Sequence, residues 1–285
     1  MSLHTHLSRR NLLAGAAGTL AFATADRIAA QGGKPNIVFI LADDLGFADV
    51  SCYGQRDYTT PNIDRLALEG MRFIQAYSNS PDCSATRTAL ISGRYQYRLP
   101  VGLEEPIVPT TPKNIGLPPS HPTLPSVLKK AGYSTTLVGK WHLGFLPDFS
   151  PLKSGYDHFF GIYGCCADYF NHGPDASRSG DFAYQLHEEE VPVERHGYMT
   201  NLLGDRAIQT IEGYASRKSR FCWACISRRR IGHGRGRMTR SNRSDFGTLG
   251  TSGLATAVLR RPTQKWGRAW MPILGECCER WTFTS

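Results

Sequence analysis

The sequence contains no apolar run long enough to span a bilayer. The run that comes nearest lies between Arg10 and Asp26 and is uncharged. A spanning helix needs about 20 consecutive, predominantly apolar residues, and this run is shorter. The sequence therefore predicts no stable membrane anchor.

Acidic residues are almost absent from the last part of the chain. Residues 221–285 hold 12 of the 33 basic residues and 3 of the 24 acidic ones, so the entire net charge of +9 falls there. The segment also lacks clear hydrophobic periodicity and any recognisable nucleic-acid-binding module. A basic segment with aromatic residues is the usual pattern of a nucleic-acid surface. Without periodicity or a module, we predict that no nucleic acid is bound.

The N-terminal residues have the pattern of an export signal. Arg9 and Arg10 precede the short apolar run, and small residues cluster around Ala25 and Ala30, where cleavage is plausible. A twin arginine before such a run is typical of a Tat-type signal. We therefore expect residues 1–30 to be a signal peptide for the Tat translocase and the mature protein to be periplasmic or secreted.

A predicted strand leads directly into two aspartates. Residues 35–41 form a continuous apolar and β-branched run, typical of a strand buried on both faces of an α/β sheet. Asp43 and Asp44 follow, and functional residues of open α/β sheets sit at the carboxyl ends of strands. Paired carboxylates are hard oxygen ligands, and adjacent like charges are costly without a cation. The pair indicates a Ca²⁺ or Mg²⁺ site, with a solvated Asp-Asp turn as the alternative.

Several further segments have the pattern of regular elements. Apolar periodicity and terminating glycines predict helices over residues 60–70 and 124–132, and an amphipathic helix over 198–215. Residues 72–77 and 133–142 have the composition of strands. The proline-rich stretch between Leu99 and Pro125 lacks periodicity, which predicts a long surface loop.

The stretch Cys83-Ser84-Ala85-Thr86-Arg87 begins at a predicted helix N-terminus. Asp82 is a good N-cap residue and Gly93 a good terminator. The free N–H groups and the positive dipole end favour an anion at Cys83 or on a substrate bound there. Because Arg87 lies one turn further along the same face, its guanidinium can point back at residue 83. A nucleophile beside a fixed cation suits an oxyanion-bearing substrate.

Lys140 and His142 form a second candidate pair. They are two residues apart in the predicted strand 133–142, so both side chains point to one face if the strand persists. A lysine and a histidine at a strand's carboxyl end can neutralise an anion and move a proton. The alternative is a structural histidine in the core.

Taken together, these motifs resemble those of sulfatases. The stretch from Cys83 to Arg94 is similar to the family signature, Cys-x-(Pro/Ala)-x-Arg followed by a small residue, glycine and arginine. Asn-Ile-Val-Phe-Ile-Leu-Ala-Asp-Asp-Leu-Gly at residues 36–46 and Gly-Lys-Trp-His-Leu-Gly at 139–144 resemble two more family motifs. The resemblance covers roughly residues 36–215.

The resemblance implies a mechanism and a set of ligands. In the family, a maturation enzyme oxidises the cysteine, here Cys83, to formylglycine, whose hydrated aldehyde attacks the sulfur of a sulfate ester. By the same resemblance Asp43 and Asp44 bind Ca²⁺, with Mg²⁺ the less favoured ion, together with residue 83. Arg87 supports the formylglycine. Lys140 and His142 hold the sulfate of a small molecule or glycan.

The resemblance also implies a fold and a domain division. It predicts an α/β, alkaline-phosphatase-like sandwich around a central mixed, largely parallel sheet, incomplete at the C-terminus. We expect residues 35–219 to be the N-terminal part of the catalytic domain. Residues 220–285 are then a basic tail, non-native or disordered.

We hypothesise that the reading frame shifts near Ser219, which would account for the abrupt change of composition there. Read one base out of register, codons for Cys225 through Arg235 are compatible with Leu-His-Phe-Thr-Ala-Pro-His-Trp-Pro-Trp-Glu, which resembles a strand and histidine motif of sulfatases. The family's later Asp-Asn metal pair, further histidine and later lysine are absent from this sequence. We therefore expect a truncated, weakly active or inactive sulfatase. A phosphatase or phosphonate hydrolase of the same superfamily and a non-catalytic fragment remain the alternatives.

Overall fold

The computed structural model describes residues 34–99, 107, 111–165, 167–172, 185–217, 221–228 and 254–259. The predicted signal peptide, Cys166, the part of the predicted Leu99–Pro125 loop at residues 100–106 and 108–110, and most of the basic C-terminal segment lie outside these ranges. Within the described part, no helix is both long enough and apolar enough to cross a membrane.

One mixed sheet forms the centre of the fold, and its strand order is β5-β4-β3-β2-β6-β1-β7. Strands β3, β2, β6 and β1 run parallel to one another, and β7, β4 and β5 join antiparallel at the edges. This arrangement confirms the predicted α/β class with a central mixed sheet. The strands are β1 Asn36–Asp43, β2 Ser134–Lys140, β3 His158–Ile162, β4 Leu186–Glu188, β5 Val191–Pro192, β6 Phe221–Arg228 and β7 Leu254–Leu259.

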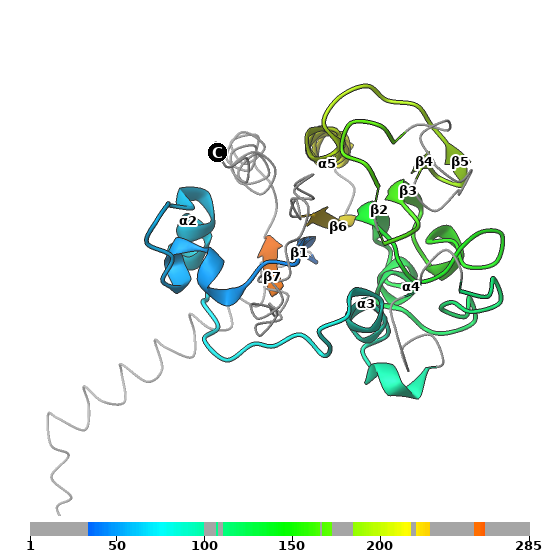
Figure 1. Cartoon of the computed structure of the whole chain (residues 1–285), viewed down its shortest axis with the longest axis horizontal. Coiled ribbons are helices and arrows are strands. Elements are labelled where there is room, and N and C mark those ends of the chain that lie inside the picture. The colour runs from blue at the N-terminus through cyan, green and yellow to red at the C-terminus, as the bar shows by residue number, and fades with distance from the viewer. Residues whose placement is uncertain are drawn as a thin grey trace, which may run out of the picture. The chain divides into compact units, whose positions relative to one another are not determined.

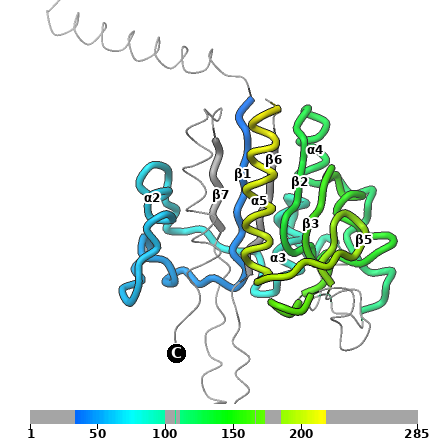
Figure 2. The backbone as a smooth tube through the Cα atoms, turned by 90° about the horizontal axis from the view of Figure 1, so that it is seen from above, coloured from blue at the N-terminus to red at the C-terminus, as the bar shows by residue number. Residues whose placement is uncertain are grey.

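Helices cover the two faces of the sheet (Figure 1). Helix α5 packs against β2, β3 and β6, whereas α4 packs against β2 and α3. Figure 2 shows α5 running along the strands beside β1 and β2. The α-helices are α2 Pro61–Glu69, α3 Cys83–Ser92, α4 Leu124–Lys130 and α5 Met199–Ser216, and the 3-10 turns are Phe47–Asp49, Ser51–Tyr53, Gln96–Arg98 and Leu152–Ser154.

Alternation along the strands divides the core in two. Val38 and Ile40 of β1 point to the α5 face, where they join Leu203 and Ala207 in one buried cluster. Leu41 points the other way, and with Phe39, Leu137 and Ile91 it belongs to the cluster on the α3 face. Because successive strand residues face opposite sides, one continuous apolar run serves both layers.

Most of the elements lie where the sequence predicts them. Helices α2, α4 and α5 confirm the three predicted helices, with Gly70 following α2 and Gly132 (φ 84°) following α4. Pro61 at the start of α2 and a Thr123 capping box on α4 supply the expected start signals.

Two strand predictions are wrong. Residues 72–77 form no strand and pair with none of the described strands. Their apolar side chains Phe73, Ile74 and Tyr77 are exposed instead. The strand expected over 133–142 ends at Lys140, and His142 has a left-handed backbone with φ 59°.

The start of the basic C-terminal segment contributes to the sheet. Phe221–Arg228 forms β6 between β1 and β2, beyond the domain boundary expected at residue 219, and Leu254–Leu259 forms β7. The rest of the predicted tail lies outside the described residues, so its non-native character stays a prediction.

Candidate functional site

Three elements meet at the carboxyl edge of the parallel strands. Asp43 is the last residue of β1, Lys140 is the last residue of β2, and α3 begins at Cys83. The crevice beyond the carboxyl ends of parallel strands is the general position of ligand sites in α/β sheets. The fold thus brings together the three segments that the sequence selects.

A buried ion triad joins these elements. The Asp43 carboxylate accepts a hydrogen bond from Arg87 Nη2 at 2.9 Å and another from Lys140 Nζ at 2.9 Å. Arg87 Nη1 also donates to the Lys140 carbonyl at 2.8 Å. The three side chains are only 4–5% exposed. Both oxygens of Asp43 are therefore occupied by cations of the chain itself.

The charges of the triad set the ionisation of Asp43. Burial by itself raises the pKa of this carboxyl, but the neighbouring Arg87 and Lys140 charges outweigh burial and hold the pKa far below its usual range. Asp43 is therefore an anion throughout the ordinary pH range. One carboxylate beside two cations leaves a net positive, buried cluster, which favours an anionic ligand.

Glycine is required where β2 approaches the triad. Gly139 has φ 125°, a conformation that side-chain-bearing residues rarely adopt, and it directly precedes Lys140. Across the strand pair, a Cβ on Gly161 would lie only 1.7 Å from the Gly139 carbonyl oxygen. Two facing glycines thus allow the strand to bend before Lys140 while it remains paired with β3.

His142 is fully buried beside this edge. Its Nε2 lies 2.5 Å from the Ile107 carbonyl oxygen, while Nδ1 has no partner among the described residues. Burial, with the positive charge of Lys140, lowers the pKa of His142 to about 3, so the ring is neutral near pH 7. The neutral ring donates from Nε2 to Ile107, which leaves Nδ1 as a buried hydrogen-bond acceptor.

Helix α3 fixes the position of Cys83. Residues Ser84 to Ala89 are all buried. Thr86 Oγ1 donates to the Ser80 carbonyl at 2.6 Å, which ties the first turn of the helix to the preceding loop. Cys83 is a free thiol and half-buried, and the Asp82 side chain forms no cap hydrogen bond. The first N–H groups of the helix have no intrahelical partners, so this end can receive an anion.

The hydrogen bonds of Arg87 run to β1 and β2. Its two terminal nitrogens bind Asp43 and the Lys140 carbonyl, and only Nε remains buried without a partner. The unpartnered Arg87 Nε and His142 Nδ1 are polar atoms that a bound ligand can satisfy.

The described residues do not form a complete metal site. Asp43 is engaged by two cations, Asp44 is exposed with φ 59°, and no group of three or more His, Cys, Asp and Glu side chains in the described ranges could hold an ion. Divalent oxygen sites use six or more ligands, some of them water. The predicted set of Asp43, Asp44 and residue 83 therefore does not fit a divalent ion unaided.

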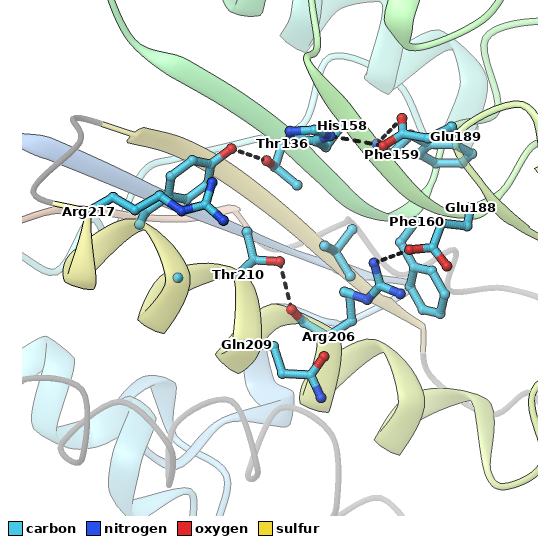
Figure 3. A pocket seen from close by; sticks show the side chains of 13 residues that line it. Thr136, His158, Phe159, Phe160, Glu188, Glu189, Arg206, Gln209, Thr210 and Arg217 are labelled. Carbon is cyan, nitrogen blue, oxygen red and sulfur yellow. Dashed lines mark hydrogen bonds and ion pairs between the residues drawn. The ribbon is translucent and has the colours of Figure 1, made fainter.

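A cavity of about 250 Å³ lies between α5 and the strands, on the face of the sheet opposite α3. Two of its polar pairs are marked in Figure 3, one between Arg206 and Glu188 and one between His158 and Glu189. Arg206 Nη1 donates to Glu188 at 2.7 Å, and His158 Nδ1 lies 2.9 Å from Glu189 Oε1. Arg217 lines the cavity as well. None of the described residues that line it is a cysteine, serine or lysine. We therefore place the functional site at the Asp43 edge.

The chain matches a known protein family over most of the described sheet. The sulfatase family model matches residues 35–228. The chain belongs to the sulfatase family. The match ends at the last residue of β6, so it extends past residue 215, where the resemblance of the motifs ends.

Curated sulfatases share substantial identity with the chain. N-acetylgalactosamine-6-sulfatase of Rattus norvegicus is 47% identical over 135 residues, covering 46% of this chain and 26% of its own length. The Mus musculus protein of the same name is 38% identical over 200 residues, with coverages of 66% and 38%. Arylsulfatase J of Mus musculus is 40% identical over 194 residues, with coverages of 67% and 31%. The chain thus spans well under half the length of these relatives.

Solved structures with the same fold include two bound to carbohydrates. Ps i-CgsB in complex with k-i-k-neocarrahexaose has a TM-score of 0.63 at 26% identity, covering 86% of this chain and 53% of that one. BT4656 in complex with its substrate D-glucosamine-2-N,6-O-disulfate has a TM-score of 0.52 at 26% identity, with coverages of 68% and 34%. These matches agree with the predicted alkaline-phosphatase-like fold.

The sequence motifs select Asp43, Arg87, Lys140 and His142. They do not indicate which hydrogen bonds join these side chains. The Ile107 carbonyl that orients His142 lies in a stretch without motifs. The pairing of Arg87 with Asp43 joins residues 44 positions apart, and no local pattern encodes it. The glycine in Gly139-Lys140 was the one available signal of a bend.

Proposed function

We propose that this chain carries the nucleophile side of a sulfatase active site, which cleaves a sulfate monoester after Cys83 is converted to formylglycine. The observation that carries the proposal is the buried triad of Asp43, Arg87 and Lys140, beside a helix that begins at Cys83. Membership of the sulfatase family supports it. Because the chain spans only part of its relatives, the activity of the whole protein is part of this proposal.

Each residue of the site has a role that follows from its surroundings. Residue 83, once modified, would supply the attacking hydroxyl, and the S–O bond of the ester would break with release of the alcohol. Lys140 and Arg87 give this edge of the sheet its positive charge, which attracts the sulfate and offsets the charge that develops on its oxygens. Asp43 holds both cations in place through its two hydrogen bonds.

His142 acts through an acceptor atom. Since its Nε2 donates to Ile107, the free Nδ1 can accept a hydrogen bond from a hydroxyl but cannot donate one to a sulfate oxygen. His142 therefore suits the orientation of a hydroxyl on residue 83, whereas its low pKa makes it a weak base for that hydroxyl. This assignment narrows the role that the family resemblance implies.

A divalent cation would find only part of its ligand set among the described residues. Asp43 and Asp44 supply carboxylates, but the described residues lack the remaining ligands. We expect this chain to bind Ca²⁺ weakly, so 1 mM Ca²⁺ should leave the unfolding temperature nearly unchanged. A rise of several degrees, reversed by chelator, would show that the chain completes the site with residues outside the described ranges.

The substrate class and location follow from the same proposal. A sulfated glycan or small molecule suits the positive charge of the Asp43 edge, and relatives act on sulfated sugars by name. Export by the Tat translocase carries folded protein, which suits a cysteine that a maturation enzyme must modify first. The signal at residues 1–30 and the periplasmic or secreted location stay predictions, because those residues are outside the described ranges.

Mass spectrometry tests the modification directly. The chain is co-expressed with a formylglycine-generating enzyme, and the tryptic peptide that ends at Arg87 is measured. We expect it to lose the sulfur of Cys83 and to react with a hydrazide probe. Cys52 and Cys165 in the same digest are internal controls and should remain thiols.

Two outcomes separate failure of the enzyme from failure of the proposal. A reporter peptide of known reactivity, added to the same culture, shows whether the maturation enzyme is active. If the reporter is converted and Cys83 remains a thiol, the proposed nucleophile is wrong. Cys83→Ala should abolish the hydrazide signal and any hydrolysis of an aryl sulfate.

A further inference from the structure

A short segment at the end of α3 presents aromatic and basic side chains outward. It is Arg94-Tyr95-Gln96-Tyr97-Arg98, and Tyr95 and Tyr97 are 61% and 60% exposed. Both arginines are exposed as well. Large aromatic side chains are usually buried, so two of them side by side on the surface need a reason.

The two tyrosines form an ordered pair. Their ring centroids lie 6.2 Å apart and the rings are nearly parallel, with an interplanar angle of 24°. The 3-10 turn Gln96–Arg98 holds this spacing, with Arg98 N donating to the Tyr95 carbonyl at 3.0 Å. A pair of flat, nearly parallel rings is a platform on which planar or ring-shaped ligands can stack.

Buried neighbours make the platform rigid. Gln96 between the tyrosines is only 1% exposed, and its Nε2 donates to the Asn79 carbonyl at 2.9 Å. Leu99 is buried in the core cluster on the α3 face. Asn79 lies four residues before Cys83, so the segment is fastened to the loop that leads into the candidate active site. Pre-ordering of this kind lowers the entropic cost of binding.

The charge of the platform selects an anionic partner. Neither Arg94 nor Arg98 forms a side-chain ion pair with any acidic residue that the structure describes. Guanidinium groups bind sulfate and phosphate oxygens through paired hydrogen bonds. The two tyrosine rings lie between Arg94 and Arg98 in the sequence. This order suits a polymer whose rings have flat, apolar faces for stacking and carry sulfate groups for the arginines.

We propose that Arg94, Tyr95, Tyr97 and Arg98 form a non-catalytic binding platform for a sulfated polysaccharide. The sugar rings stack on the tyrosines and the sulfates pair with the arginines. The proposal takes its ligand class from the proposed function, but binding requires neither the modified Cys83 nor hydrolysis. With such a platform, the proposed active site at Cys83 would act on a polymeric sulfate ester and not on a small aryl sulfate.

Binding of chondroitin 6-sulfate oligosaccharides to the full chain tests the platform. We expect Tyr95→Ala/Tyr97→Ala to weaken binding about tenfold, and Tyr95→Phe/Tyr97→Phe to retain it, because stacking does not need the hydroxyl. Arg94→Ala/Arg98→Ala should weaken binding and make it less sensitive to salt. Chemically desulfated chondroitin, which keeps its carboxylates, should bind much more weakly.

Matched controls account for the basic C-terminal segment. Tyr77→Ala and Arg217→Ala change an exposed tyrosine and an exposed arginine elsewhere and should leave binding unchanged. Equal binding by the wild type and Tyr95→Ala/Tyr97→Ala, with folding verified by circular dichroism, would overturn the platform. A single-stranded oligonucleotide that binds as tightly and loses affinity in the same variants would overturn the sugar assignment.

The same measurements made with Cys83→Ala separate the two proposals. If Cys83→Ala binds the oligosaccharide normally but cannot be modified, the platform stands independently of the nucleophile. If modification of Cys83 succeeds while the tyrosine variants bind normally, the proposed function stands and the platform fails.

Discussion

At the residue scale, the site is organised by one buried carboxylate. Asp43 receives two cations from separate elements, α3 and β2. Removing one partner of a buried charge leaves the other under-compensated, which costs far more than breaking a surface pair. The triad therefore determines the stability of this edge of the sheet as well as its charge.

The triad can be tested by comparing two lysines. Lys140→Met removes a buried partner of Asp43, whereas Lys129→Met removes the half-exposed bridge to Asp157. We expect Lys140→Met to lower the free energy of unfolding by about 2–4 kcal/mol, slightly less than a fully broken buried pair because Arg87 remains. Lys129→Met should lower the free energy of unfolding by at most about 1 kcal/mol. Urea unfolding measures both, and equal losses would contradict a special role for the triad.

Buried neutral histidines make stability depend on pH. Burial lowers the pKa of His187 to about 4, against its ordinary 6.5, and that of His142 to about 3. Between pH 6.5 and 4 the unfolded chain binds these protons and the folded chain does not, so stability is full above pH 6.5 and falls as pH decreases.

His187→Gln tests this linkage at a residue away from the triad. Each buried histidine contributes a slope of about 1.4 kcal/mol per pH unit in that window. We expect the variant to lose less stability than the wild type when the pH is lowered from 6.5 to 4.5, as measured by urea unfolding at several pH values. Parallel pH profiles for the two proteins would show that His187 takes up its proton in the folded state.

At the scale of elements, local patterns determined most of the fold. The apolar run of β1, the terminating glycines of α2 and α4 and the periodicity of α5 are all local, and the structure confirms each one. The strand expected over residues 72–77 is wrong because a strand also needs a partner. Likewise, the Arg87 to Asp43 contact depends on how α3 is placed against β1, which sequence periodicity does not specify.

The facing glycines of β2 and β3 provide a sharp test at this scale. Gly161→Ala places a methyl group 1.7 Å from the Gly139 carbonyl oxygen, which forces the parallel strands apart. We expect a loss of about 3 kcal/mol or more, or no cooperative unfolding. Gly213→Ala in α5 meets no atom within 4 Å and should be neutral or stabilising by roughly 0.5–1 kcal/mol. Urea midpoints that agree for the two variants would contradict the close approach.

At the scale of the whole molecule, the open point is where the sulfatase fold gives way to the basic segment. The charge step near Ser219 places the change before β6, whereas the family match continues to residue 228. Phe221–Arg228 is paired on both sides, with β1 and β2, and a strand in that position cannot leave without opening the sheet.

Limited trypsin digestion distinguishes these boundaries. The glycine and arginine content of residues 231–243 cannot offset the entropy of ordering them, so we expect the first cuts there. The pairing of β6 should protect Phe221–Arg228 and leave a resistant fragment that extends from about Asn36 to about Arg228. A resistant fragment that ends at Arg217 or Arg220 would instead place β6 in the non-native tail.

Genomic DNA around codons 219–235 then gives an independent answer, because a frame shift requires the neighbouring frame to read as a strand followed by His-x-x-x-x-His and to stay open past codon 285.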